Sequence, residues 1–256
     1  MMAQPRLLID AKLATGAELE LTEGQARHVG TVLRLKEGDA LRVFNAEDGE
    51  WRARVSARSK RGMSVRVGDK LRDARATSDL DLLFAPVKRH ATDLIVEKAA
   101  ELGVRRIRPV ITQRTIAETV RLDRLQTIAR EAAEQSERFE APELFEPLPL
   151  AKALDGWDAA RTLIYADEAG DDANAPWGGE TGRAKPIVDA LAAQRPSKAL
   201  ALLIGPEGGF TLEERRMLRS LGYVMPVSLG PRILRAETAV IAALSVIQAV
   251  WGDWRS

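Results

Sequence analysis

Apolar and polar residues alternate over several short runs in the first 75 residues, and a period of two is typical of half-buried β-strands. The alternating runs are residues 40–45, 51–57 and 63–67. Asp48-Gly49, between the first two runs, has the composition of a tight hairpin turn. One stretch near residues 23–35 predicts a helix. Short strands joined by tight turns predict a small β-barrel over residues 1–75.

The hydrophobic pattern changes from residue 76 onward. Apolar runs that predict buried strands cover residues 80–85, 107–111, 162–166, 199–204 and 223–229. Helical periodicity predicts helices over residues 92–102, 122–139, 211–222 and 236–251. Strands that alternate with helices are typical of a mostly parallel sheet covered on both faces, so we predict an α/β domain over 76–256. Two segments, 141–150 and 170–186, are rich in turn-forming residues and predict surface loops.

The amino-acid composition excludes several kinds of catalytic and metal-binding site. The chain has no cysteine, which excludes disulfides, thiolate catalysis and cysteine-based zinc or iron–sulfur sites. Its two histidines, His28 and His90, lie far apart in the sequence. They argue against a histidine-rich metal site or a serine–histidine triad, and no metal is expected. The longest apolar run, 236–251, contains Glu237 and is too short to cross a bilayer. We therefore expect a soluble cytoplasmic protein without a membrane partner.

The overall net charge of +1 gives no argument for nucleic-acid binding, so any basic surface must be local. One such region exists: residues 51–75 contain nine lysines or arginines and two aspartates. Arg52 and Arg54 alternate along a predicted strand and must therefore share a face. This local excess of positive charge suits contact with phosphates, although a solvated charged face explains any one of these residues equally well.

Two segments combine glycines with a place between a strand and a helix. The first is Ile204-Gly-Pro-Glu-Gly-Gly-Phe210, which precedes a capping box formed by Thr211 and Glu214. Glycines there allow a ligand to approach the backbone closely, and such a turn lies at the carboxyl edge of a parallel sheet, where α/β folds bind ligands. The segment is neither a Walker loop nor a dinucleotide fingerprint. On glycine content alone, a simple tight turn fits equally well.

The second segment, residues 229–239, reads Leu-Gly-Pro-Arg-Ile-Leu-Arg-Ala-Glu-Thr-Ala. Arg232 and Arg235 flank the apolar pair Ile233-Leu234, which suits an apolar slot for a planar ring with cations at its rim. Surface ion pairs are the alternative interpretation of the two arginines. If both segments are strand-to-helix turns, they can face each other across one crevice.

Together, GPEGGF and LGPRILRAETA resemble the cofactor-binding signature of the SPOUT methyltransferases, specifically the ribosomal RNA small-subunit methyltransferase E family. Further stretches of the chain agree with it: residues 97–104, 131–138 and 28–39. The similarity covers nearly the whole chain. One departure lies after the first strand of the second domain, where the family commonly has Lys-Gly-x-Lys/Arg and this chain has Val87-Lys88-Arg89-His90. The 170–186 segment is also longer and more acidic than the family pattern.

The resemblance implies a PUA-like, RNA-binding β-barrel over residues 1–75. It also implies a SPOUT α/β methyltransferase domain with a C-terminal trefoil knot over 76–256, and a homodimer. The implied cofactor is S-adenosyl-L-methionine, and the implied reaction is methylation of N3 of a uridine in the 16S ribosomal RNA of the small subunit. The residues implied to bind the cofactor are Ile204, Gly205, Pro206, Glu207, Gly208, Gly209, Leu229, Gly230, Ile233, Leu234, Arg235 and Thr238.

Uracil N3 carries a proton, so the site must favour the anion of the base with a proton acceptor or with cations near O2 and O4. Arg235, Arg232 and Arg138 are the candidates for stabilising the charge. Glu237 is the first candidate for accepting the proton, and Glu134 is the second. A cap on the last helix or an ion pair with Arg235 would explain Glu237 without catalysis.

The candidates for RNA contact are Arg34, Arg52, Arg54, Lys88, Arg89 and Arg114. Two other functions stay open. One is a knotted methyltransferase that acts on transfer RNA or on a ribose 2′-oxygen. The other is a non-catalytic RNA-binding factor of ribosome assembly. The sequence gives neither the target nucleotide nor the dimer geometry.

Overall fold

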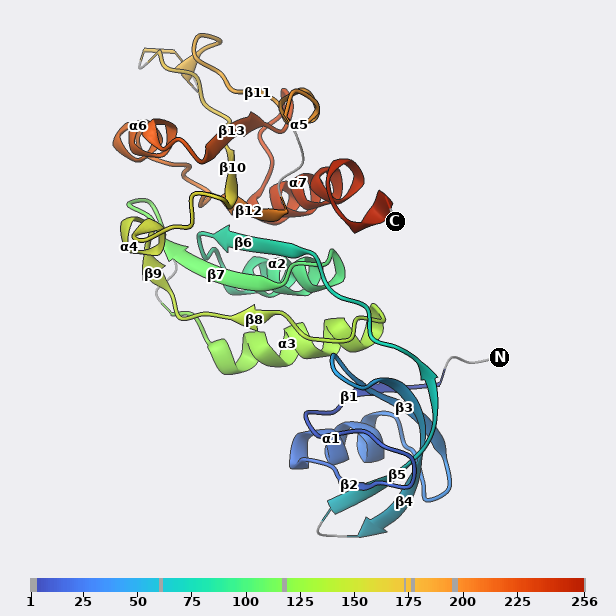
Figure 1. The fold of residues 1–256 in the computed structure, drawn as a ribbon. Helices are drawn as coiled ribbons and strands as arrows, with labels where there is room; N and C mark the ends of the chain where they lie inside the picture. The colour runs from blue at the N-terminus through green and yellow to red at the C-terminus, as the bar shows by residue number, and fades with distance from the viewer. Residues whose placement is uncertain are drawn as a thin grey trace. The chain divides into compact units, whose positions relative to one another are not determined.

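The computed structural model describes residues 4–59, 62–116, 119–172, 174–175, 178–194 and 198–255. The chain divides into two compact units. The first contains Met1–Ala76 and the later segment Ala133–Ala141, and the second contains Thr77–Ala132 and Pro142–Ser256. Blue and red in Figure 1 mark the N-terminal part of the first unit and the C-terminal part of the second.

The first unit is built on a five-stranded sheet with the order β1-β3-β4-β5-β2. Its strands are β1 (Arg6–Leu8), β2 (Glu18–Glu20), β3 (Ala40–Asn45), β4 (Gly49–Ser59) and β5 (Gly62–Arg72). Helix α1 (Glu23–Arg27) begins at a capping box formed by Thr22 and Gln25 and continues into the π-helical turn His28–Val32. The alternating pattern of the sequence is confirmed in β4 and β5, because Val55 and Val65 are buried while their neighbours along each strand are less so. In β3 the alternation holds up to Val43, and Phe44 beside it is buried as well.

The second unit holds a sheet with the order β11-β13-β10-β12-β6-β7-β8, with β9 paired to β7. Its strands are β6 (Asp79–Phe84), β7 (Arg106–Ile111), β8 (Glu143–Leu144), β9 (Leu148–Pro149), β10 (Thr162–Ala166), β11 (Lys185–Pro186), β12 (Ala199–Ile204) and β13 (Val224–Ser228). Every strand pairing found among its described residues is parallel, as predicted. The carboxyl ends of the strands therefore lie along one edge of the sheet.

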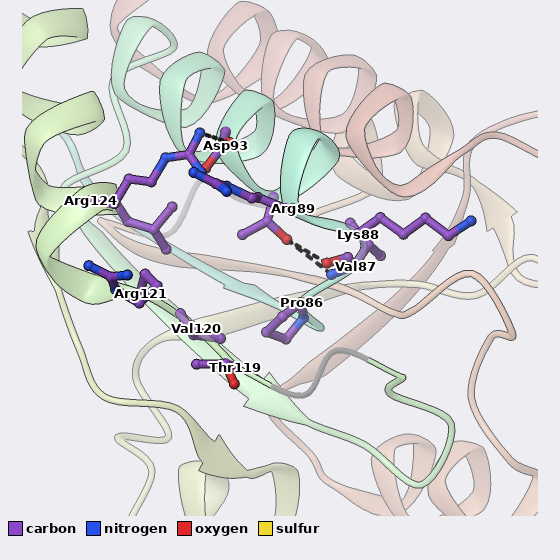
Figure 2. A pocket seen from close by; sticks show the side chains of 11 residues that line it. Pro86, Val87, Lys88, Arg89, Asp93, Thr119, Val120, Arg121 and Arg124 are labelled. Atoms are coloured by element: carbon purple, nitrogen blue, oxygen red, sulfur yellow. Dashed lines mark hydrogen bonds and ion pairs between the residues drawn. The ribbon is translucent and has the colours of Figure 1, made fainter.

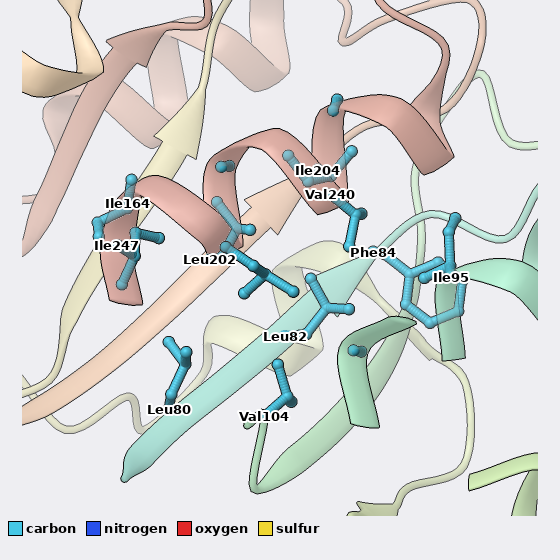
Figure 3. Packing of buried hydrophobic residues seen from close by; sticks show 14 of the residues in the cluster. Leu80, Leu82, Phe84, Ile95, Val104, Ile164, Leu202, Ile204, Val240 and Ile247 are labelled. Carbon is cyan, nitrogen blue, oxygen red and sulfur yellow. The ribbon is translucent and has the colours of Figure 1, made fainter. Parts of the chain in front are cut away.

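Helices connect these strands. They are α2 (Arg89–Glu101), α3 (Leu122–Gln135), α4 (Leu150–Leu154), α5 (Ile187–Ala192), α6 (Leu212–Ser220) and α7 (Ala236–Val250). Helix α7 packs against α2, α5 and β12. Figure 3 shows the apolar side chains that fill the space around it: Leu80, Leu82, Phe84, Ile95, Val104, Ile164, Leu202, Ile204, Val240 and Ile247. No helix in the described part of the chain is long and apolar enough to cross a membrane.

The helix predicted over residues 122–139 was too long. It ends at Gln135, and Glu137 adopts a left-handed backbone with a φ of 61° that a helix cannot continue. Phe139 leaves the predicted helical face and packs edge-on against Phe44 of the first unit, with the ring centroids 6.3 Å apart. Tertiary packing of 133–141 onto the first sheet therefore overrides the helical periodicity.

The two predicted loops were wrong in part. Residues 141–150 contain β8 and β9, and the end of the 170–186 segment forms β11. Residues 173, 176 and 177 of that segment lie outside the described residues. Each of these strands is two residues long, so it carries no period that sequence reasoning could detect.

A cluster of buried charges ties the segment 133–141 into the first unit. Glu50, 1% exposed, accepts from Arg6 Nε at 2.7 Å and lies 3.1 Å from Arg42 Nη1, and it also pairs with Arg72. Arg6 Nη1 donates to the carbonyl oxygen of Glu134 at 3.0 Å. The Glu134 carboxylate, the second candidate for the proton acceptor, accepts from the backbone N–H of Leu8 at 2.9 Å. That contact gives Glu134 a structural role in the first unit.

Candidate active site

Three neighbouring strands position the two glycine-containing turns. Strand β10 lies between β12 and β13, with Tyr165 opposite Leu203 and Ala166 opposite Val227. Adjacent strands are about 4.8 Å apart, so the chain leaves β12 and β13 at points roughly 10 Å from each other. The two turns therefore flank the end of β10 at the carboxyl edge of the sheet, the arrangement predicted for one shared crevice.

The first turn needs its glycines for packing and for backbone conformation. A Cβ atom on Gly205 would lie 2.6 Å from the ring of Phe210, so only glycine fits beneath that ring. Gly209 has a φ of +66° and donates its N–H to the carbonyl oxygen of Pro206 at 2.8 Å. Thr211 and Glu214 then form the predicted capping box that begins α6.

Residues in the loop after β7 form hydrogen bonds with this turn and with the helix that follows it. Arg114 Nη1 donates to the carbonyl oxygen of Gly208 at 2.8 Å, and the backbone N–H of Gln113 donates to Glu214 Oε1 at 2.8 Å. Arg114, predicted to contact RNA, thus has at least one contact that stabilises the glycine turn, and its side chain stays exposed.

The second turn combines partly buried anchors with an open face. Leu229 and Leu234 pack against the core of the second unit. Between them, Gly230 has a φ of +108° and open space where a side chain would be, and the side chain of Ile233 is 53% exposed. An exposed isoleucine beside accessible backbone offers the apolar surface that a planar ring requires.

Three charged residues border this turn. Arg235 is the N-cap residue of α7, Glu237 lies partly buried in the first turn of that helix, and Arg232 is exposed. Over the described ranges, the side chains of these three residues make no hydrogen bond or ion pair. Neither a cap by Glu237 nor an ion pair with Arg235 is therefore present to explain Glu237.

A buried ion cluster at the end of β10 was not predicted from the sequence. Asp167, 2% exposed, accepts from Arg215 Nε at 2.9 Å and from Arg219 Nε at 2.8 Å. Arg215 also donates to the carbonyl oxygens of Ala169 and Gly170, each at 2.7 Å. Burial alone would lower the pKa of Arg215, but its hydrogen bond with Asp167 and the attraction between their charges raise it.

This cluster fixes the loop after β10 to α6. Two features could have indicated it: an aspartate directly after a strand, and two arginines four residues apart on one helical face. Next to it, the Tyr165 ring meets the Phe210 ring edge-on, with centroids 5.0 Å apart. Burial, followed by the charges of Asp167 and Glu168, raises the pKa of Tyr165.

The remaining predicted residues lie on other parts of the two units. Lys88 and Arg89 are exposed at the start of α2. Arg52 and Arg54 are exposed on one face of β4 and line a groove of about 650 Å³ together with Arg66.

Arg34 and Arg138 both lie in the first unit. Arg34 is exposed and has a φ of 58°. The carbonyl oxygen of Arg138 accepts from Arg6 Nη2 at 3.2 Å. The roles of the RNA-contact candidates and of Arg138 stay predictions.

Comparisons with known proteins bear on this site. One family model, described as RNA methyltransferase domain, matches residues 74–248, and another, described as RNA methyltransferase PUA domain, matches residues 21–68. A curated relative from Rickettsia conorii, named Ribosomal RNA small subunit methyltransferase E, is 32% identical over 248 residues, which cover 96% of each chain.

Two solved structures resemble the chain over nearly its full length. Ribosomal RNA small subunit methyltransferase E from Neisseria gonorrhoeae, bound to S-adenosyl methionine, matches with a TM-score of 0.81 and 28% identity, covering 98% of this chain and 99% of that one. A putative methyltransferase from Legionella pneumophila, in complex with the same cofactor, matches with a TM-score of 0.79 and 33% identity, covering 98% and 100%.

Proposed function

Because this chain belongs to the ribosomal RNA small subunit methyltransferase E family, we propose that it methylates N3 of a specific uridine in the 16S ribosomal RNA of the small subunit, using S-adenosyl-L-methionine. The observation that carries the proposal is the pair of strand-to-helix turns beside the end of β10, with Arg235 and Glu237 at the start of the following helix.

The two turns fit an adenosine-containing cofactor. In the first turn Glu207 and Gly208 are exposed, and in the second turn Gly230 leaves open space and Ile233 presents apolar surface. Arg235 and Thr238 complete the proposed set. When bound, S-adenosyl-L-methionine supplies an electrophilic methyl group on a positively charged sulfur. The chain's own task is therefore to hold the uracil in line with that methyl group and to prepare N3 as a nucleophile.

Preparation of N3 requires removal of its proton. Glu237 is placed to accept this proton, since its carboxylate has no partner that would neutralise it among the described residues. Deprotonation spreads negative charge over O2 and O4 of the base, and donors from Arg235 and Arg232 stabilise that charge. Arg138 is a third candidate for this stabilisation.

We also propose the finer structural features of the family. These are a closed PUA-like barrel in the first 75 residues, a trefoil knot in the C-terminal part of residues 76–256, a homodimer and a cytoplasmic location. The apolar composition of α7 suits burial against the knot or against a partner copy, because its residues are apolar around much of its circumference. The exposed cations Arg34, Arg52, Arg54, Lys88, Arg89 and Arg114 support contact with RNA phosphates.

Methyl transfer from labelled S-adenosylmethionine tests the proposed substrate class. The purified protein is incubated in parallel with unmodified small ribosomal subunits, protein-free 16S ribosomal RNA and transfer RNA. We expect label in the 16S ribosomal RNA, in at least one of its two forms. Label in transfer RNA alone would favour the transfer RNA alternative. Cofactor binding without transfer to any of the three would contradict the enzymatic proposal and favour a non-catalytic factor.

A further inference from the structure

A positively charged cleft opens beside the proposed active site. It has a volume of about 430 Å³ and lies between the start of α2 and the start of α3. Lys88 and Arg89 line it from the α2 side, and Arg121 and Arg124 line it from the α3 side (Figure 2). Asp93 is the one acidic residue in this lining among the described residues, so cations exceed acids by three.

The donors in this cleft outnumber their acceptors. Arg124 Nη2 donates to Asp93, but Arg124 Nη1 is buried and finds no acceptor in the described ranges. Arg121 pairs with Asp123 at 2.7 Å, and both side chains are largely exposed, so this pair is weak. The side chains of Lys88 and Arg89 make no hydrogen bond or ion pair within the described part of the chain. Arg124 Nη1 is thus one buried donor without an acceptor, on a side chain that is 35% exposed, and an anionic ligand would supply the missing acceptor.

The backbone of α2 adds to the positive potential. Lys88 is its N-cap residue and makes no side-chain cap, and the first turn contains no acidic residue. Cations near a helix N-terminus are unfavourable, because this end already carries partial positive charge. Thr92 Oγ1 donates to the carbonyl oxygen of Val87 at 3.0 Å and accepts from its N–H at 3.1 Å, which fixes the loop that carries Lys88. The arrangement becomes favourable when an anion is bound.

A smaller cleft connects this region to the glycine turn. It measures about 90 Å³ and shares Pro86, Val87 and Lys88 with the larger cleft. Its other lining residues are Arg114, Ile116, Pro206 and Glu207. Lys88 therefore borders both the cationic cleft and the turn proposed to hold the cofactor. An anion in the larger cleft would therefore share Lys88 with a ligand held at the glycine turn.

We propose that this cleft binds a backbone phosphate of the RNA substrate close to the methylated nucleotide, with Arg121 and Arg124 as binding residues in addition to Lys88 and Arg89. The proposal rests on the proposed function, in which RNA is the substrate. Arginine suits the role because its planar guanidinium pairs with two phosphate oxygens at once.

The ion pair between Arg124 and Asp93 provides a sharp test. Arg124→Gln and Asp93→Asn each break the same pair, so a purely structural role would make both variants weaken RNA binding through loss of fold. If the cleft binds phosphate, the two substitutions should change RNA affinity in opposite directions. We expect Arg124→Gln to weaken binding to a 16S ribosomal RNA fragment about tenfold or more. Asp93→Asn should bind more tightly than wild type. Lys152→Gln, an exposed cation on α4, serves as the control and should bind as wild type does.

Salt dependence and kinetics complete the test. In Arg124→Gln, the slope of log affinity against log salt concentration should fall by about 0.7–0.9. The KM for RNA should rise, while kcat at saturating RNA and the affinity for S-adenosylmethionine stay unchanged. Unchanged RNA affinity, KM and salt slope in Arg124→Gln would overturn the proposal. Equal weakening of RNA binding by Arg124→Gln and Asp93→Asn would also overturn it.

A titration with uridine monophosphate separates a free nucleotide from RNA as the source of the phosphate. Binding of the mononucleotide as tight as that of the RNA fragment, with equal sensitivity to Arg124→Gln, would contradict the RNA assignment. Much weaker binding of the mononucleotide supports it. These outcomes are distinct from failure of the proposed function, since that failure would appear with the wild-type enzyme, as label in transfer RNA alone or as no label in any RNA tested.

Discussion

Replacing Glu237 by glutamine is expected to lower kcat for RNA methylation by a factor of about 10²–10⁴, the range for loss of a positioned proton acceptor. Glutamine has nearly the same shape but cannot take the N3 proton. Because the Glu237 side chain makes no hydrogen bond or ion pair within the described ranges, the substitution should leave the fold and the affinity for S-adenosylmethionine unchanged. The deficit should shrink as the pH rises, because hydroxide then removes the proton in place of the carboxylate.

Glu213→Gln is the matched control for this experiment. Glu213 is an exposed acid in the first turn of α6, so both substitutions remove one negative charge close to a helix N-terminus. The control should keep wild-type activity. Single-turnover rates and isothermal titration with the cofactor separate the chemical step from binding. If Glu237→Gln turns over as fast as Glu213→Gln, then Glu237 is not the proton acceptor.

Replacing Glu50 by glutamine should destabilise the first unit by about 3–5 kcal/mol, the usual cost when one partner of a buried ion pair is removed. Glu50 is 1% exposed and is surrounded by Arg6, Arg42 and Arg72. Without its charge, three guanidinium groups would face one another with Glu137 as their remaining acidic partner among the described residues. Urea denaturation followed by circular dichroism measures the change.

Glu18→Gln is the control for this second prediction. Glu18 also pairs with an arginine on the same sheet, Arg66, at 3.0 Å, but both side chains are largely exposed. Water already screens such a pair, so its loss should leave the unfolding midpoint nearly unchanged. If the unfolding midpoint of Glu50→Gln moves as little as that of Glu18→Gln, the buried cluster contributes little to stability.

The arginines around Glu50 also hold the backbone of the segment 134–138. Arg6 donates to the carbonyl oxygens of Glu134 and Arg138, and Arg72 Nη2 donates to Glu137 at 2.8 Å. Burial alone would raise the pKa of Glu137, but its hydrogen bond with Arg72 and the nearby positive charges keep it below its usual value. The cluster thus fixes the backbone of Arg138, a candidate for stabilising the uracil anion.

Periodicity in the sequence predicted the strands and helices that are long enough to repeat a pattern. The three inner strands of the first sheet, the main parallel strands and the capping box at Thr211 all follow from it. Strands β1 and β2, each three residues long, carry too little pattern to be recognised. The end of α3 depended on contacts distant in the sequence, because Phe139 packs against Phe44 and Glu137 turns the chain.

Sequence analysis could find those parts of the candidate site in which the backbone conformation permits few residue types other than glycine. Gly209 and Gly230 occupy left-handed conformations, which is why their segments are recognisable in the sequence. The ion cluster of Asp167 with Arg215 and the cleft residues Arg121 and Arg124 were not predictable in the same way. Charged residues make up 29% of the chain, so a single arginine or aspartate in the sequence cannot be told from an ordinary surface residue. Only the fold brings the members of these clusters together.

Nucleoside analysis identifies which atom of the 16S ribosomal RNA receives the methyl group. Unmodified small subunits are treated with the enzyme and cofactor, the 16S ribosomal RNA is digested, and the modified nucleoside is identified by mass spectrometry against synthetic standards. We expect 3-methyluridine at a single position, formed about 10²–10⁴ times more slowly in the reaction with Glu237→Gln. A 2′-O-methylated nucleoside, or methylation of a base other than uracil, would contradict it.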